Sequence, residues 1–184
     1  MHVSWRTLLL VASIAACRQA TPKVEARVAP LASDSLRGVL SVTGSEPMVR
    51  LVLRHEGGVC DVREAIPSGL SAAQGLEITV WGVRDDRSGA LTPAGPGCGI
   101  AVSHFAVRSA DGLAATDGTL CSAAAGYELR LTGGARRPLV GVPPALQSQR
   151  GARIYWVGPL DRAPSAYGVL EENIQRALER MCEA

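Results

Sequence analysis

The feature that most constrains this chain of 184 residues is an internal repeat. Gly38-Val39-Leu40 is followed 80 positions later by Gly118-Thr119-Leu120, and Arg50-Leu51 is followed at the same offset by Arg130-Leu131. Beyond these, the offset shortens to 76, and six residues match in order: Pro67, Leu70, Gly75, Ile78, Gly82 and Asp85 with Pro143, Leu146, Gly151, Ile154, Gly158 and Asp161. Ordered matches at constant spacing predict two copies of one small domain, at residues 36–110 and 116–184.

The first copy has the residue pattern of a small β domain. Short runs that alternate or are continuously apolar predict five strands, at residues 38–43, 48–55, 59–63, 76–83 and 100–108. A brief helical turn is expected at 70–75, before the fourth strand. The Gly- and Pro-rich segment 88–99 is expected to be a loop between the last two strands.

This order of three strands, a short helix and two strands resembles the five-stranded OB-fold. Turn 70–75 followed by Ile78-Thr79-Val80-Trp81-Gly82 is similar to the approach of that fold to its fourth strand. The predicted fold class is mainly β, with two tandem small OB-like five-stranded barrels and a C-terminal amphipathic helix. An SH3-like barrel or one larger sandwich would also fit the strand pattern. The resemblance brings no catalytic residues with it.

The second copy ends differently from the first. It repeats the pattern through residues 153–157 and then has room only for a short strand near 167–170. Apolar residues next recur at helical spacing, at Leu170, Ile174, Leu178 and Met181. They predict a terminal helix that covers a barrel or the seam between the barrels.

Alternation along the strands also predicts which side chains form the cores. The inward residues are Leu40, Leu51, Leu53, Ile78 and Val80 in the first copy, and Leu120, Leu129, Leu131, Ile154 and Trp156 in the second. Trp81 is predicted to point outward, where its ring exposes a large apolar area unless something covers it. Trp81 is therefore the candidate binding residue, and the alternative is that the sister barrel covers it.

The N-terminal segment has the order of a secretory signal peptide, residues 1–16: a basic residue, an apolar run at 8–12, then small residues. The run is much shorter than the roughly 20 residues that span a bilayer. Ile14-Ala15-Ala16-Cys17 resembles the lipobox of bacterial lipoproteins, which implies cleavage before Cys17 and lipidation of its thiol. The alternative is an ordinary cleaved leader followed by a soluble periplasmic or secreted protein, with Cys17 incidental.

Residues 17–35 contain prolines and scattered charges but no hydrophobic period, which predicts a flexible tether. Arg18 stands where an aspartate would resemble the inner-membrane retention signal. The resemblance thus implies a lipid-anchored protein of the cell envelope, at the outer membrane and facing the periplasm. The membrane would be a partner through the N-terminal lipid.

Composition argues against nucleic acid as a partner. Once the leader with Arg6 is removed, 18 basic residues face 17 acidic residues, so no basic footprint is present. Phe105 is the only phenylalanine, and the other aromatic residues are scattered, so a base-stacking platform is also unsupported.

The sequence predicts no catalytic residue, no metal site and no cofactor. His55 and His104 are the only histidines after the leader, and a zinc site would need more ligands. His55 with Cys60, or His104 with Cys98, could meet across a sheet, but exported cysteines more often pair with one another. Ser103 and His104 are strand neighbours, so their side chains are expected on opposite faces, which would prevent activation of a serine nucleophile.

Four cysteines remain after Cys17, and an exported chain with an even number of them is expected to form two disulfides. Three pairings are open. In an OB-type barrel the third and fifth strands are neighbours, so the resemblance implies a bond between Cys60 and Cys98. It leaves Cys121 for Cys182, a bond that would clamp the terminal helix over its own barrel.

Two classes of function stay open. The first is a noncatalytic envelope lipoprotein, a binding or structural module whose partner is an envelope protein or a glycan. The second is a periplasmic enzyme or metal-dependent protein with a site assembled from dispersed residues. An exposed apolar groove around Trp81 would favour the first class. A pocket that joins His55 or His104 to carboxylates, with no disulfide nearby, would favour the second.

Overall fold

The computed structural model of this chain is mainly β. It describes residues 34–47, 49–63, 66–85, 91–92, 95–96, 98–172 and 182. The predicted leader, Cys17, the tether up to residue 33 and positions 173–181 of the predicted terminal helix lie outside the described residues. Among the helices of the described part, none has the length and apolar character needed to cross a membrane.

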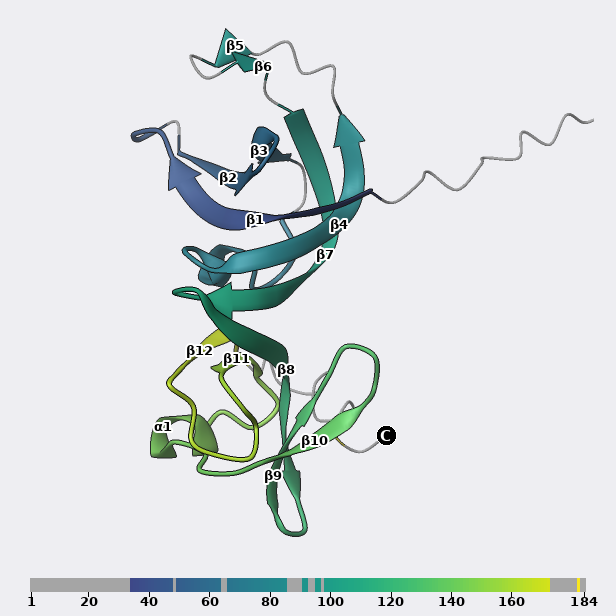
Figure 1. Ribbon diagram of the computed structural model, residues 1–184, viewed down its shortest axis with the longest axis vertical. Coiled ribbons are helices and arrows are strands. Elements are labelled where there is room, and N and C mark those ends of the chain that lie inside the picture. Colours follow the sequence, from purple (N-terminus) through teal and green to yellow (C-terminus); the bar gives the residue numbers. More distant parts are fainter. Residues whose placement is uncertain are drawn as a thin grey trace, which may run out of the picture. The chain divides into compact units, whose positions relative to one another are not determined.

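Five strands of the first copy, repeat 1, pair in a closed ring (Figure 1). They are β1 (Asp34–Thr43), β2 (Arg50–His55), β3 (Gly58–Arg63), β4 (Glu77–Asp85) and β7 (Cys98–Ala110), with the 3₁₀ helix η1 (Ser71–Ala73) before β4. β1 pairs antiparallel with β2 and β4, and β2 pairs antiparallel with β3. β7 closes the ring, because it lies parallel to β3 and antiparallel to β4.

Two expectations for repeat 1 need adjustment. β1 begins at Asp34, which lies opposite Gly82 of β4, so residues 34 and 35 belong to the sheet and not to the tether. The segment expected to be a loop contains a short hairpin of β5 (Leu91–Thr92) and β6 (Gly95–Pro96).

The second copy, repeat 2, contains the same kinds of element but a different set of pairings. Its elements are β8 (Leu113–Ala123), β9 (Gly126–Arg130), β10 (Arg136–Leu139), α1 (Pro144–Gln147), β11 (Arg153–Val157) and β12 (Ala166–Glu171). β8 pairs with β9 and β11, β9 with β10, and β11 with β12. Within the described residues β10 and β12 do not pair, so the strand order is open where repeat 1 is closed.

A tight hairpin joins the repeats. β7 and β8 pair antiparallel, with Ala110 opposite Leu113, so only Asp111 and Gly112 lie in the turn. Both turn residues have positive φ, 49° and 76°, as in the turns whose twist matches that of a hairpin. The last strand of repeat 1 therefore continues directly into the first strand of repeat 2.

The same local geometry occurs in both repeats. Gly38 lies opposite Ile78, and Gly118 lies opposite Ile154. The Gly75 N–H donates to the Leu40 carbonyl at 2.9 Å, and the corresponding bond, from Gly151 to Leu120, is 2.8 Å long. Ile78 and Ile154 thus occupy equivalent positions, as the repeat predicts.

The registers correct one part of the sequence alignment. Leu40 lies opposite Leu53, and Leu120 lies opposite Leu129, so Leu53 corresponds to Leu129 at an offset of 76. The match of Arg50-Leu51 with Arg130-Leu131 was therefore wrong. The physical reason is the length of the first hairpin loop, which has six residues (44–49) in repeat 1 and two (124–125) in repeat 2.

The predicted core residues are buried, except that Leu131 is only partly buried. Burial of a large aliphatic side chain stabilises a fold by about 1.5–3 kcal/mol, so these residues account for much of the sheet packing. Trp156 is fully buried, and its indole N–H donates to the Pro159 carbonyl at 3.1 Å. Val157 and Leu170 pack against the core of repeat 1, which joins the two cores.

Candidate functional site

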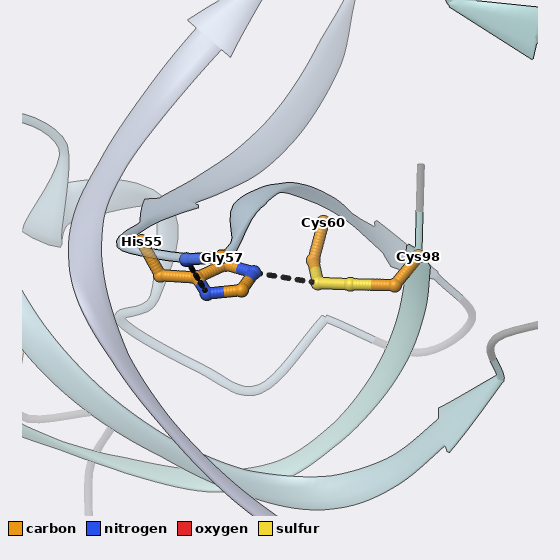
Figure 2. The surroundings of a disulfide bond; sticks show 4 residues. All are labelled: His55, Gly57, Cys60 and Cys98. Atoms are coloured by element: carbon orange, nitrogen blue, oxygen red, sulfur yellow. Dashed lines mark hydrogen bonds between the residues drawn. A yellow bond between two sulfur atoms is a disulfide. The ribbon is translucent and has the colours of Figure 1, made fainter. Parts of the chain in front are cut away.

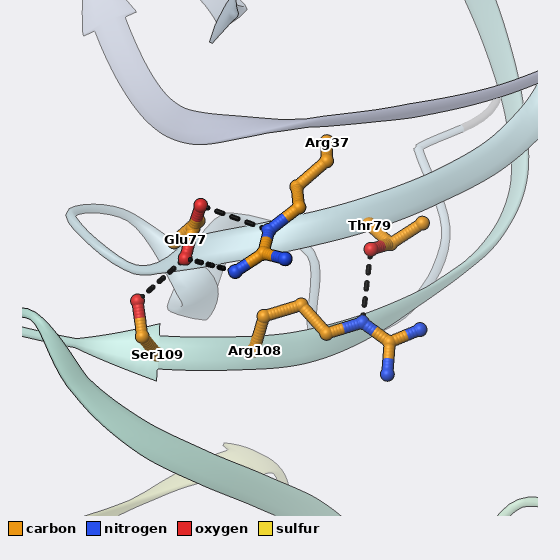
Figure 3. Close-up of polar contacts among 5 residues, drawn as sticks. All are labelled: Arg37, Glu77, Thr79, Arg108 and Ser109. Carbon is orange, nitrogen blue, oxygen red and sulfur yellow. Dashed lines mark hydrogen bonds and ion pairs between the residues drawn. The ribbon is translucent and has the colours of Figure 1, made fainter.

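Trp81 and His104 form a face-to-face aromatic stack on the outer side of repeat 1, and we call this stacked pair the plate. The two residues lie opposite each other on β4 and β7, and their rings stack with centroids 4.7 Å apart and planes inclined by 4°. The Arg108 guanidinium lies 5.6 Å from the centre of the Trp81 ring. Its Nε donates to the Thr79 hydroxyl at 2.9 Å (Figure 3). The Trp81 ring therefore has the His104 ring stacked on it and the Arg108 guanidinium held over it.

Ser103 and His104 do not lie on opposite faces, and that expectation was wrong. The β4–β7 register shifts between Trp81 and Gly82, which pair with His104 and Val102, so Ser103 is the extra residue of a bulge. Both side chains are exposed, between the buried Val102 and Phe105. Ser103 Oγ lies 3.0 Å from His104 Nδ1.

This contact does not make a nucleophile. The Ser103 hydroxyl donates to the Trp81 carbonyl at 2.9 Å, so its single proton is not available to the imidazole. His104 Nδ1 must then be the donor to Ser103 Oγ, and Nε2 is left as an acceptor when the ring is neutral. The pair fixes the orientation of the plate instead of activating the serine.

A pocket of about 420 Å³ lies against the plate, between the two repeats. Repeat 1 lines it with Trp81 and residues 104–108, and repeat 2 lines it with residues 115–117 and 131–133. Trp81 is half-buried. The sister repeat therefore forms the far wall of a pocket over Trp81.

Asp117 and Arg153 form the polar part of the seam. Asp117 is buried, and its carboxylate accepts from the Val107 N–H at 2.8 Å and from Arg153 Nε at 2.9 Å. Arg153 also donates to the Phe105 carbonyl at 2.6 Å, and its guanidinium lies 4.1 Å from the centre of the Phe105 ring. Both carboxylate oxygens are occupied, so Asp117 is a structural link between the repeats.

A second cavity of about 230 Å³ shares His104, Phe105, Leu131 and Thr132 with the first. Its other lining residues are Gly118, Thr119, Arg130, Arg153 and Glu171. The Nη1 atom of Arg130 is buried and has no hydrogen-bond partner. We call the two adjoining cavities together the seam groove.

The sequence did not reveal the seam groove, but a signal for its polar pair exists in the repeat. In repeat 1 the corresponding pair is Arg37 and Glu77, with bonds of 2.9 Å from Nε and Nη2 to the two carboxylate oxygens (Figure 3). The positions are the same and the charges are exchanged, so a search for identical residues passes over them. The Ser109 hydroxyl also donates to Glu77, at 2.7 Å. The hydrogen bonds from Arg37 and Ser109 hold the pKa of the Glu77 carboxyl below its ordinary value.

Cys60 and Cys98 are bonded as predicted, and His55 lies beside them (Figure 2). The two cysteines lie opposite each other on the parallel strands β3 and β7, with Cα atoms 4.5 Å apart. His55 Nδ1 accepts from the Gly57 N–H at 3.1 Å, so the proton of a neutral ring is on Nε2, which lies 3.4 Å from Cys60 Sγ.

The potential ligand atoms of His55, Cys60 and Cys98 all lie within 4.8 Å of one another. The sulfurs are used in the disulfide and Nε2 carries a proton, so this cluster is not prepared to bind a metal.

Cys121 and Cys182 form the second predicted disulfide, with Cα atoms 5.5 Å apart. Cys121 is buried on β8, so the bond fixes a residue near the end of the chain to the first strand of repeat 2. The helix that this bond was expected to clamp lies largely outside the described residues.

Comparisons with protein-family models, with curated proteins and with solved structures find no match to this chain. No residue role is therefore carried over from a relative. The chemistry of the seam groove has to be inferred from its own side chains.

Proposed function

We propose that this chain is a noncatalytic, lipid-anchored envelope protein whose two OB-like repeats bind a glycan in the seam groove. The observation that carries the proposal is the Trp81–His104 plate, which lines an open pocket between the repeats. The cation of Arg108 lies over the Trp81 ring. This combination of aromatic rings and polar groups in one pocket suits a sugar ring.

The strand order supports the OB-like assignment of repeat 1. Its ring runs β1, β2, β3, β7, β4 and back to β1, with β3 and β7 parallel and every other pair antiparallel. The third and fifth long strands are therefore neighbours, and this pairing supports the proposal that repeat 1 is a small OB-like barrel. Repeat 2 follows the same order along β8, β9 and β11, and we propose that it is an open version of the same barrel.

Stacking is the physical basis of the proposed sugar binding. A pyranose ring has a face of C–H groups that can lie on an aromatic ring, while its hydroxyls need hydrogen-bond partners around the edge. His104 Nε2 offers an acceptor, Arg108 offers donors, and Thr116 and Thr132 offer hydroxyls in the same groove. A pocket of about 420 Å³ has the size of a site for a small ligand, whereas a protein partner typically buries about 800 Å² of each surface.

The same geometry argues against one form of the enzyme alternative, in which Ser103 is the nucleophile and Asp117 a general base. His104 and Asp117 do line one pocket, which is the arrangement that would favour catalysis. However, Ser103 donates its proton to a backbone carbonyl, and Asp117 is held by Arg153 and the Val107 N–H. Neither group is available as a nucleophile or as a general base.

Binding of oligosaccharides, followed by isothermal titration, tests the proposed function. The probes are uncharged and carboxylated oligosaccharides. A nucleobase that stacks on an aromatic side chain contributes about 1–3 kcal/mol, and we expect a sugar ring to contribute a similar amount, so Trp81→Ala should weaken binding about tenfold or more. Tyr167→Ala is the control, since Tyr167 is an exposed aromatic residue of β12 outside the groove. Equal affinities of Trp81→Ala and the unmodified protein would contradict the proposal.

Lipid anchoring is tested separately. Mass spectrometry of the mature N-terminus from membrane extracts is expected to find acylated Cys17, because Ile14–Cys17 resembles a lipobox. Cleavage at another position, or a free thiol on Cys17, would contradict the proposed anchor. Neither result would bear on the proposed glycan binding in the seam groove.

A further inference from the structure

Arg130 is the feature of the seam groove that the proposed function leaves unexplained. It ends β9 and lies opposite Thr119 of β8, which is buried. The Nη1 atom of Arg130 is shielded from solvent and donates to no group. Arg130 as a whole is only partly buried, but an N–H group shielded from water without an acceptor is unfavourable, because it has lost its hydration and gained no hydrogen bond in return.

The repeat shows that this burial comes from the seam and not from the strand. Arg54 is the equivalent of Arg130, since each lies one residue after the leucine that faces Leu40 or Leu120. Arg54 is exposed to solvent. In repeat 2, His104 and Phe105 of β7 line the cavity that holds Arg130, so the neighbouring repeat converts an exposed arginine into a partly enclosed donor.

The charges around Arg130 favour an anion. Arg153 in the same cavity is matched by Asp117, and Arg108 at the plate makes its only bond in the described part of the chain through Nε. Glu171 is the one acidic residue that lines the groove without an ion pair among the described residues. Two arginines, Arg108 and Arg130, thus line the groove with one such carboxylate, Glu171.

We infer that the seam groove selects an acidic glycan, in which a carboxylate binds the Arg130 guanidinium while a sugar ring lies on the Trp81–His104 plate. The inference rests on the proposed function and adds the chemical class of the ligand. A carboxylate accepts charge-assisted hydrogen bonds from a guanidinium, and these are about twice as strong as bonds between neutral groups. It would place a negative charge beside a guanidinium that lines the cavity and makes no ion pair among the described residues.

The test compares trigalacturonic acid with its fully methyl-esterified form, which keeps the rings and removes the charges. The unmodified protein is expected to bind the acid about tenfold more tightly than the ester, a difference typical of one charge-assisted contact. Arg130→Gln is expected to abolish this preference and leave binding of the ester unchanged. Arg54→Gln is the matched control and is expected to keep the preference, because Arg54 lies in the other repeat and outside the groove.

Two further variants sharpen the result. Glu171→Gln removes the competing carboxylate and is expected to raise affinity for the acid about threefold, with no change for the ester. Arg130→Lys keeps the charge and is expected to retain part of the preference, which excludes loss of folding as the cause. Circular dichroism of each variant gives the same check.

The outcomes separate the inference from the proposed function. Equal binding of acid and ester by the unmodified protein would overturn the acidic ligand and leave the glycan site standing. If Arg54→Gln loses the preference for the acid over the ester as completely as Arg130→Gln does, the inference is overturned and the proposed glycan site still stands. Failure of both probes to bind would overturn the inference together with the proposed glycan site.

Discussion

The two repeats place equivalent residues in different surroundings. In repeat 1, Gly38, Arg54 and Glu77 line a surface groove beside His55. In repeat 2, the equivalent Gly118, Arg130 and Arg153 line the cavity that β7 of repeat 1 helps to enclose. The comparison teaches that a neighbouring domain, more than the local sequence, decides whether a duplicated position is a solvated surface or a candidate binding site.

The exchanged ion pairs show the same difference in energetic terms. The side chains of Arg37 and Glu77 are 62% and 30% exposed, whereas those of Arg153 and Asp117 are 20% and 4% exposed. Exposed ion pairs are screened by water and salt and stabilise little. Removal of one partner from a buried pair leaves an unpaired charge and is strongly destabilising. The two pairs should therefore differ greatly in their response to mutation.

The largest effect is expected at Asp117. Asp117→Ala leaves Arg153 and the Val107 N–H without their acceptor, so the free energy of unfolding should fall by about 3–5 kcal/mol. Arg37→Ala, the change at the equivalent position of repeat 1, should cause a much smaller loss. Urea denaturation of both variants measures the difference. Similar decreases in the free energy of unfolding for the two variants would contradict a buried ion pair between Asp117 and Arg153.

The two disulfides are the next comparison. The loop-closure model assigns each about 4 kcal/mol, and the sequence separations of 38 and 61 residues make the bonds differ by only about 0.4 kcal/mol. Serine replacement of Cys60 and Cys98, or of Cys121 and Cys182, should thus lower stability by similar amounts in urea denaturation. If replacement of Cys121 and Cys182 lowered stability by over about 2 kcal/mol more than replacement of Cys60 and Cys98, repeat 2 would depend on its disulfide far more than loop-closure entropy explains.

Gly38 and Gly118 should respond alike, because the close approach of strands is common to both repeats. A Cβ atom at Gly38 would clash with the Arg54 carbonyl oxygen, and a Cβ atom at Gly118 would lie 2.5 Å from the Arg130 carbonyl oxygen, which is also a clash. Alanine at either position should cost about 1–3 kcal/mol, as overpacking does. Gly133→Ala is the control, since nothing lies within 4 Å of its added Cβ. A neutral Gly118→Ala would contradict the equivalence.

The smallest effect is expected at Glu77. Its pKa is lowered chiefly by the hydrogen bond from Arg37, so the stabilising contribution is present above the ordinary pKa of 4.5 and is lost as the pH falls through the lowered pKa. Glu77→Gln should lower stability by less than about 1 kcal/mol at neutral pH, and the difference should vanish in acid. Urea midpoints measured from pH 7 down into acid give the test. A difference that does not diminish as the pH falls would assign the effect to packing.

Much of the fold could be predicted because its signals are local. Alternation of apolar residues placed five strands of repeat 1 within a few residues of their observed bounds, since one face of each strand must be buried. The Cys60–Cys98 bond followed from strand adjacency in the resembling fold. The alignment error at Arg50-Leu51 arose because a shorter hairpin loop, and not a change within a strand, removes four residues from repeat 2.

The site was only partly predictable. Alternation along the strand gave the outward direction of Trp81. The same alternation predicted Ser103 and His104 on opposite faces, whereas the bulge in β7 places both side chains on one face. The roles of Asp117, Arg130 and Arg153 depend on contact with the neighbouring repeat, which no strand pattern reports. Because the charges of the equivalent ion pairs are exchanged between the repeats, a search for identical residues could not point to Asp117 and Arg153.

Chemical-shift mapping with labelled protein and trigalacturonic acid tests most directly whether the seam groove, and not its counterpart in repeat 1, is the binding site. We expect the shifts to concentrate on the Trp81 indole N–H, the His104 ring and the Arg130 side chain, while the signals of Arg54 and His55 stay in place. Shifts centred on Arg54 and His55, or none in either groove, would contradict the proposed site.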